Sequence, residues 1–153
     1  MTFYAHTADG HDGNPLPESS GKWQPLADHL RNVADLAAGF AAPFGAADEA
    51  RLSGLLHDMG KYRPEFQSYL KGQRSSSVET QHAIFGAAWA ADNSRQQLFA
   101  SKLAIAGHHA GLHDHSDLEG MFGKRGLRIP DSIPSLIARL ESELGPLPPP
   151  PTP

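Results

Sequence analysis

Apolar residues recur every three or four positions over most of the chain, which is the pattern of helices that bury one face. After an irregular segment over residues 1–21, the first such stretch begins near Leu26 and places His29 and Phe40 on its apolar stripe. A second helix is predicted from Asp48, as its N-cap, to Gly60, as its stop. The segment GLLHDMGKY, residues 54–62, therefore ends a core-packing helix on His57 and Asp58.

Further helices are predicted over residues 64–71, from about residue 80, over residues 94–106 and, more weakly, over residues 132–144. No segment of alternating polarity indicates a strand, and the stretch GHHAGLHDHSD is expected to form a loop. We therefore expect an all-α protein of packed helices. The domain is predicted over residues 1–145, and residues 146–153 form a proline-rich tail that cannot continue a helix.

Composition says little about the fold, but it restricts the kinds of metal ligand and binding partner that the protein can have. The 153 residues suit one domain, and the net charge of −4 indicates no general affinity for nucleic acid or membranes. The absence of cysteine excludes disulfides and thiolate metal sites, while nine histidines point to imidazole and carboxylate ligands. Without a signal-peptide pattern or an apolar run of ~20 residues, we expect a soluble, cytoplasmic protein without a membrane partner.

Several histidines fall where a helical core should be. His29 lies on an apolar face, His82 shares a face with Phe85 and Trp89, and His108 and His109 end a helix at a glycine. A single inward histidine is more often a hydrogen-bonded core residue than a metal ligand. Burying several unpaired imidazoles in one small core is costly, however, and a shared cation would satisfy them together.

The order of the motifs identifies a family resemblance. The segments YAHT, WQPLADHL, LLHDMGKY, FQSYL, HAIFGA and AGHHAGLHD, between residues 3 and 115, resemble the HD nuclease domain of CRISPR type I interference proteins. The chain is also similar, more distantly, to the wider HD phosphohydrolase superfamily. The resemblance implies a compact helical HD-domain bundle with a metal site between its helices.

The resemblance also implies a ligand set for two metal ions. Its members are His29, His57, Asp58, His82, His108 and His109. In the family pattern Asp58 bridges both ions, His29 and His57 complete one site, and the other three histidines complete the second. Asp58 and Lys61 are the residues implied in catalysis, with Lys61 near the scissile phosphate. His6, in the segment that resembles the family's AHS motif, either supports a ligand or is an ordinary loop residue.

One element of the family pattern is missing. The family's last acidic ligand lies in a late helix, and neither Asp117 nor Asp131 has the expected sequence context. The site of His29 and His57 is therefore expected to be one ligand short, to bind its ion more weakly and to reduce activity. The missing ligand has three alternative explanations. The chain is an excised or truncated domain, it is a variant that has lost full activity, or water or a partner residue fills the gap.

These features predict a nuclease that uses one or two divalent transition metals, namely manganese, cobalt, nickel or iron, with magnesium as a further candidate. Metal-bound water would supply hydroxide at neutral pH, and the resemblance implies that it cleaves single-stranded DNA in CRISPR interference. No P-loop pattern occurs, so these residues are not the ATP-driven motor itself. A CRISPR helicase, whether fused or separate in the full protein, and the surveillance complex are the expected partners. The rivals are a phosphohydrolase of nucleotides, which needs a closed pocket, and a catalytically weakened docking or DNA-binding module.

Overall fold

The computed structural model describes residues 1–92, 98–122 and 129–151, with the side chain of His115 excepted. Two short strands, β1 (Tyr4–His6) and β2 (Gln24–Pro25), precede the main helices α1 (Leu26–Ala41), α2 (Ala47–Leu56), α3 (Pro64–Leu70), α4 (Ile84–Ala90), α5 (Phe99–Gly107), α6 (His115–Phe122) and α7 (Ile129–Leu144). Single 3-10 turns lie between them at η1 (Glu18–Ser20), η2 (Ala42–Phe44), η3 (Met59–Tyr62) and η4 (Val78–Thr80). In the part of the chain so described, no helix is both long and apolar enough to cross a membrane.

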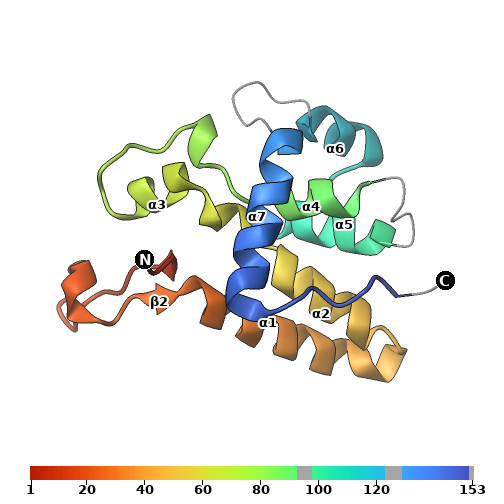
Figure 1. The fold of residues 1–153 in the computed structure, drawn as a ribbon, viewed down its shortest axis with the longest axis horizontal. Helices are drawn as coiled ribbons and strands as arrows, with labels where there is room; N and C mark the ends of the chain where they lie inside the picture. The colour runs from red at the N-terminus through yellow and green to blue at the C-terminus, as the bar shows by residue number, and fades with distance from the viewer. Residues whose placement is uncertain (93–97, 123–128, 152–153) are drawn as a thin grey trace.

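The helices pack in two pairs that α7 joins. α1 lies along α2, and α4 lies along α5, with α2 also contacting α5. α7 crosses the molecule in front of both pairs and contacts α1, α4 and η3 (Figure 1). In the view of Figure 1, α3 lies to the left of α7, and α4 and α5 lie to its right. The all-α prediction is confirmed, because packed helices enclose one hydrophobic core.

The buried stripe of α1 differs slightly from the predicted one. Leu26, Leu30, Ala34 and Ala38 are buried at intervals of four residues, as a helix packed on one side requires. Phe40, which the sequence pattern placed on the stripe, is 77% exposed. The error arises because the apolar residues of α1 extend beyond the face that α2 covers.

Two glycines allow the backbone around residues 57–60 to approach α4. A side chain at Gly86 would place its Cβ 2.1 Å from the carbonyl oxygen of Leu56, at the end of α2. A side chain at Gly60 would place its Cβ 2.3 Å from the carbonyl oxygen of His82. Any larger residue would force these segments apart, so both glycines hold the end of α2 against the segment that carries His82.

Several predicted element boundaries are wrong. α2 has Ala46 as its N-cap residue, with no side-chain cap from Asp48, and ends at Leu56 rather than Gly60. α4 begins at Ile84, so His82 precedes that helix, and α6 begins inside the stretch expected to be a loop. The predicted start of the fifth helix at residue 94 lies outside the described residues. The two strands were missed because two or three residues are too few to show alternation.

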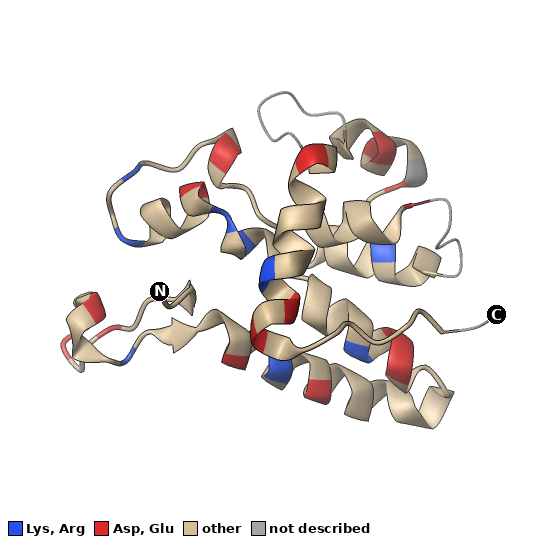
Figure 2. Ribbon diagram, in the orientation of Figure 1, with Lys and Arg blue, Asp and Glu red and all other residues tan. Residues whose placement is uncertain are grey.

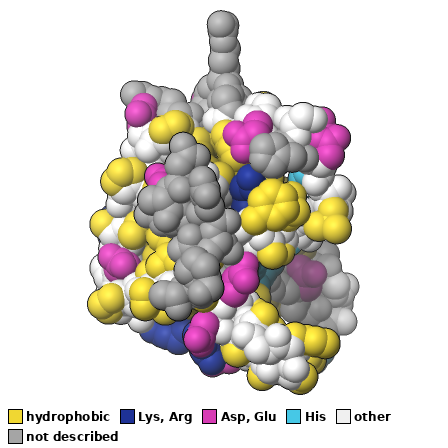
Figure 3. Space-filling view, turned by 90° about the vertical axis from the view of Figure 1, so that its right-hand side faces the viewer, with side chains coloured by type: hydrophobic (Ala, Val, Ile, Leu, Met, Phe, Trp, Pro, Cys, Tyr) yellow, Lys and Arg dark blue, Asp and Glu magenta, His cyan; other side chains and the backbone are white. Residues whose placement is uncertain are grey.

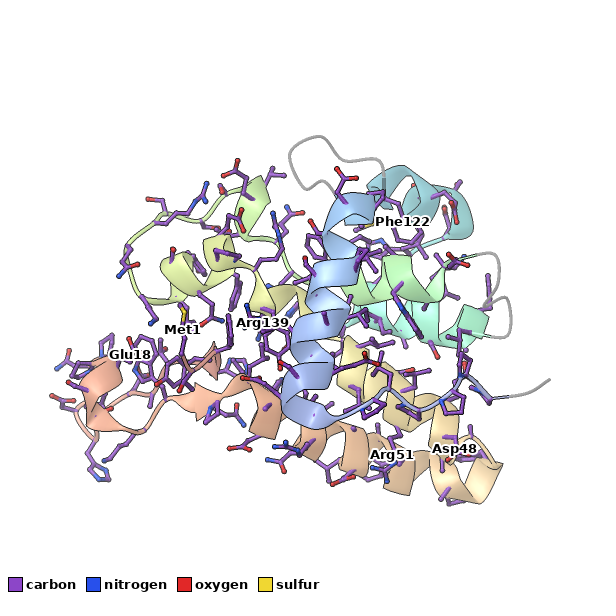
Figure 4. The ribbon with its side chains drawn as sticks, viewed as in Figure 1. Met1, Glu18, Asp48, Arg51, Phe122 and Arg139 are labelled. Carbon is purple, nitrogen blue, oxygen red and sulfur yellow. The ribbon has the colours of Figure 1, made fainter. Side chains whose placement is uncertain are left out.

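The ends of the domain pack onto the core. β1 pairs antiparallel with β2, Tyr4 opposite Pro25 and His6 opposite Gln24. Arg139 of α7 extends toward this N-terminal strand (Figure 4), and its guanidinium lies 5.1 Å from the ring centre of Phe3. After α7 ends at Leu144, Leu147 packs against the core. The division at residue 145 stays a prediction.

Candidate metal centre

The Asp58 carboxylate lies at the centre of the histidine cluster, at the junction of α2 and η3. Its side chain is 3% exposed. Oδ2 lies 3.1 Å from His29 Nε2 and 3.2 Å from His57 Nε2. Oδ1, on the other side, lies 3.3 Å from His108 Nε2 and 3.4 Å from His82 Nε2. One buried carboxylate therefore separates two groups of imidazoles.

We call these groups the Oδ1 cluster and the Oδ2 cluster. The Oδ1 cluster comprises Asp58, His82, His108 and His109, whose ligand atoms all lie within 4.8 Å of one another. The Oδ2 cluster comprises His6, His29, His57 and Asp58. Within it, the ligand atoms of His6, His29 and Asp58 meet the same 4.8 Å limit, and the Nε2 atoms of His29 and His57 lie 3.2 Å apart. Each cluster thus holds four donor groups, with Asp58 shared.

The hydrogen bonds of two rings leave lone pairs directed at the carboxylate. His57 Nδ1 donates to the carbonyl of Gly54 at 2.7 Å, and His108 Nδ1 donates to the carbonyl of Ile105 at 2.6 Å. A carbonyl can only accept, so a neutral ring carries its proton on Nδ1 and presents Nε2 as an acceptor. Nε2 then faces another acceptor, an Asp58 oxygen. A cation between them satisfies both, and ring orientation by a backbone carbonyl is typical of metal-binding histidines.

Asp58 Oδ1 supports the same interpretation. This oxygen is buried and accepts no hydrogen bond, although two imidazole nitrogens lie within 3.4 Å of it. An unsatisfied buried carboxylate oxygen costs free energy unless a proton or a metal ion compensates it. The residues of both clusters therefore fit divalent cations.

Two helix ends add negative potential at the centre. α2 ends at Leu56, directly before His57, and α5 ends at Gly107, directly before His108. The carbonyl groups at a helix C-terminus carry partial negative charge, which stabilises a cation within about one turn. His57 and His108 each directly follow a helix C-terminus, so the partial negative charge of that helix end favours a cation bound at the imidazole.

Burial and the contacts between neighbouring side chains both shift the pKa values of the cluster. Burial by itself raises the pKa of Asp58, but the adjacent imidazoles of His108, His29 and His57 outweigh it and hold that pKa well below its usual range. Burial lowers the pKa of His82 to about 4. Burial also lowers the pKa of His108, but the nearby Asp58 carboxylate leaves it raised overall. At neutral pH Asp58 is thus an anion and His82 offers a neutral lone pair.

Lys61 lies beneath Asp58 rather than on the surface. Its side chain is 3% exposed, and Nζ lies 2.9 Å from Asp58 Oδ2. Nζ also donates to the carbonyl of Ala5 at 3.2 Å. This position allows Lys61 to neutralise and orient the carboxylate. Its predicted action near a phosphate stays a prediction.

The structure brings together every residue that the sequence singled out. These residues are His6, His29, His57, Asp58, Lys61, His82, His108 and His109. Neither Asp117 of α6 nor Asp131 of α7 belongs to a metal-type cluster among the residues that the structure describes. The histidine surface visible on the face in Figure 3 is confined to small areas. Direct ligation by each residue stays a prediction.

Sequence reasoning missed Gln67 of α3. Its amide Nε2 donates to the carbonyls of Tyr4 at 2.9 Å and Lys61 at 2.8 Å, and its Oε1 accepts from the Tyr4 N–H at 3.0 Å. Gln67 therefore fixes the strand that carries His6 to the segment that carries Lys61. A glutamine in a short helix gives no sequence signal for such a role.

Comparison with known proteins agrees with the geometry. The sequence profile of the HD domain matches residues 26–141, which is well over half of the chain. The comparison with curated proteins gives no match. The matched segment contains the paired His57 and Asp58 at the centre of both clusters. The chain thus belongs to the HD domain family, within the HD phosphohydrolase superfamily, and its buried histidine and aspartate cluster is the candidate site for divalent metal.

Proposed function

We propose that the protein is a metal-dependent phosphodiesterase that cleaves single-stranded DNA in CRISPR interference. The observation that carries the hydrolytic part is the Asp58 carboxylate between two groups of imidazole donors. Transition-metal ions held there would supply Lewis acidity and an activated water. The order of motifs that resembles the CRISPR nuclease domain supports the choice of single-stranded DNA, delivered by a CRISPR helicase within a surveillance complex.

The distribution of charge supports an anionic substrate bound at the centre rather than along the surface. In the view of Figure 2, acidic and basic residues are interspersed along the described part of the ribbon. The whole chain carries a formal charge of −4. Attraction for a phosphodiester would therefore arise locally, from the cations together with buried Lys61.

The test measures hydrolysis by protein loaded with manganese, cobalt or nickel. Single-stranded DNA, duplex DNA, single-stranded RNA and nucleoside monophosphates should be compared, with cleavage expected for single-stranded DNA. Asp58→Asn removes the shared carboxylate, whereas Asp35→Asn removes an exposed carboxylate of α1 that pairs with Arg51. Activity lost in the first variant and kept in the second would support the proposal.

A cavity beside the centre favours a second candidate function. It has a volume of about 410 Å³, lies between α1, α2 and α5, and has His57 and His108 in its wall. Its remaining wall is largely aliphatic, with Glu49, Ser53 and Ser101 as polar groups, and Ser101 Oγ donates to Glu49 Oε1 at 3.0 Å. Such a cavity could hold the uncharged part of a small nucleotide. Hydrolysis of mononucleotides without cleavage of DNA would select this function, and DNA binding without turnover in any metal would indicate a docking module.

A further inference from the structure

His6 lies on the Oδ2 side of the centre, where Asp58 is the only carboxylate of the cluster among the residues that the structure describes. Its ring centre is 4.9 Å from that of His29, with the two rings at 78°. One of its ring nitrogens lies within 4.8 Å of the ligand atoms of His29 and Asp58. His6 comes from β1, so it reaches the cluster from outside the helices that carry the other histidines.

Two buried polar side chains hold the β1 backbone in place. Gln67 makes a hydrogen bond to both the N–H and the carbonyl of Tyr4, at 3.0 and 2.9 Å. Lys61 donates to the carbonyl of Ala5 at 3.2 Å while it contacts Asp58. The side chain that neutralises Asp58 therefore also fixes the residue directly before His6.

The hydrogen bonds from Gln67 and Lys61 to the β1 backbone, rather than burial of the ring, determine where His6 lies. His6 itself is exposed, so burial contributes little to holding its ring beside His29. Ala5, by contrast, is 1% exposed, and the main-chain bonds on either side of it determine where the next residue points. A strand of three residues has little stability of its own, which makes the two buried partners decisive for the position of this imidazole.

We propose that His6 is the fourth protein donor of a second cation site, together with His29, His57 and Asp58. The inference rests on the proposed metal centre and deepens it, because a neutral imidazole occupies the role for which a late carboxylate was expected. The paired cations then share a single anionic ligand, Asp58, whose charge Lys61 offsets. The centre keeps more positive charge for an anionic phosphodiester, and its second cation should be a metal that favours imidazole.

The experiment counts bound cobalt in the full chain by equilibrium dialysis and titration calorimetry, without any turnover assay. The wild type should bind two ions, the second more weakly. His6→Ala should weaken the second ion more than the ~10–100-fold expected for loss of a residue that only supports a ligand. It should leave the first ion unchanged. His6→Asp should restore the second ion, and the visible cobalt spectrum should change in His6→Ala. His11→Ala, which removes an exposed histidine of the N-terminal segment, is the matched control.

Each remaining outcome separates this inference from the proposed function. Two ions bound by His6→Ala with wild-type affinities would overturn the role of His6 and leave the metal centre intact. A wild type that binds one ion only would also overturn the second site. A wild type that binds none would overturn the proposed function as well. His6→Gln, with circular dichroism, separates loss of the ligand from loss of the fold.

Discussion

Replacing Lys61 by methionine should destabilise the metal-free protein by about 3 kcal/mol. Lys61 and Asp58 form an ion pair of 2.9 Å in which both side chains are 3% exposed. Removing one partner of a buried pair leaves an uncompensated charge and costs about 3–5 kcal/mol. We take the lower end because the imidazoles beside Asp58 can bind protons. For a chain of this size the melting temperature should fall by roughly 6–12 °C.

Bound metal should reduce this difference. A divalent cation beside Asp58 replaces the charge that Lys61 provides, and its own repulsion from Lys61 disappears in the variant. Cobalt or manganese should therefore stabilise Lys61→Met more than they stabilise the wild type. Lys71→Met is the matched control, because Lys71 pairs with Glu18 at 3.0 Å where both side chains are partly exposed. Its loss should cost less than about 1 kcal/mol.

Urea denaturation followed by circular dichroism, with chelator and with saturating cobalt, measures both effects. The four free energies of unfolding from wild type and Lys61→Met give the coupling between Lys61 and the metal. If Lys61→Met unfolds within about 1 kcal/mol of the wild type and gains no more from cobalt, the reasoning from burial is refuted. Lys61 would then act only on the substrate, and its variant would lose turnover without losing stability.

Three further predictions concern the centre itself. His57→Ala and Asp58→Ala should each abolish hydrolysis while the helical circular dichroism spectrum persists, and wild-type rates in either variant at matched metal would exclude its role. Manganese, cobalt or nickel should support more activity than magnesium or calcium, because most donors are imidazoles; equal rates with magnesium alone would count against imidazole ligation. In the metal-free protein, stability should fall as the pH drops from about 6.5 toward 4, since the pKa of His82 is lowered to about 4 and the unfolded chain binds the proton first. That part of the pH dependence, at most about 3 kcal/mol, should disappear in His82→Gln when urea denaturation is compared at pH 4.5 and 7.5.

The sequence by itself determined the helical class and the residues of the centre. Helical spacing of apolar residues predicts α1, α2, α3 and α7, because burial of one face every 3.6 residues is a local pattern. The position of His57 and Asp58 after an apolar run also follows from local order. The predicted stripe of α1 failed at Phe40, since the sequence cannot say how wide a face the neighbouring helix covers.

Only the tertiary structure decided which histidines share which oxygen of Asp58. That arrangement depends on the close approach of backbones at Gly60 and Gly86, which no periodicity reveals. The tertiary structure also placed Lys61 beside the Asp58 carboxylate. It brought β1 to the centre through the hydrogen bonds of Gln67, which is 63 positions from Tyr4 in the chain. Residue types and their order are encoded locally, whereas distances of a few ångströms between distant side chains arise from packing. The donor histidines could therefore be predicted from the sequence, whereas their division between the two oxygens of the Asp58 carboxylate depends on the fold.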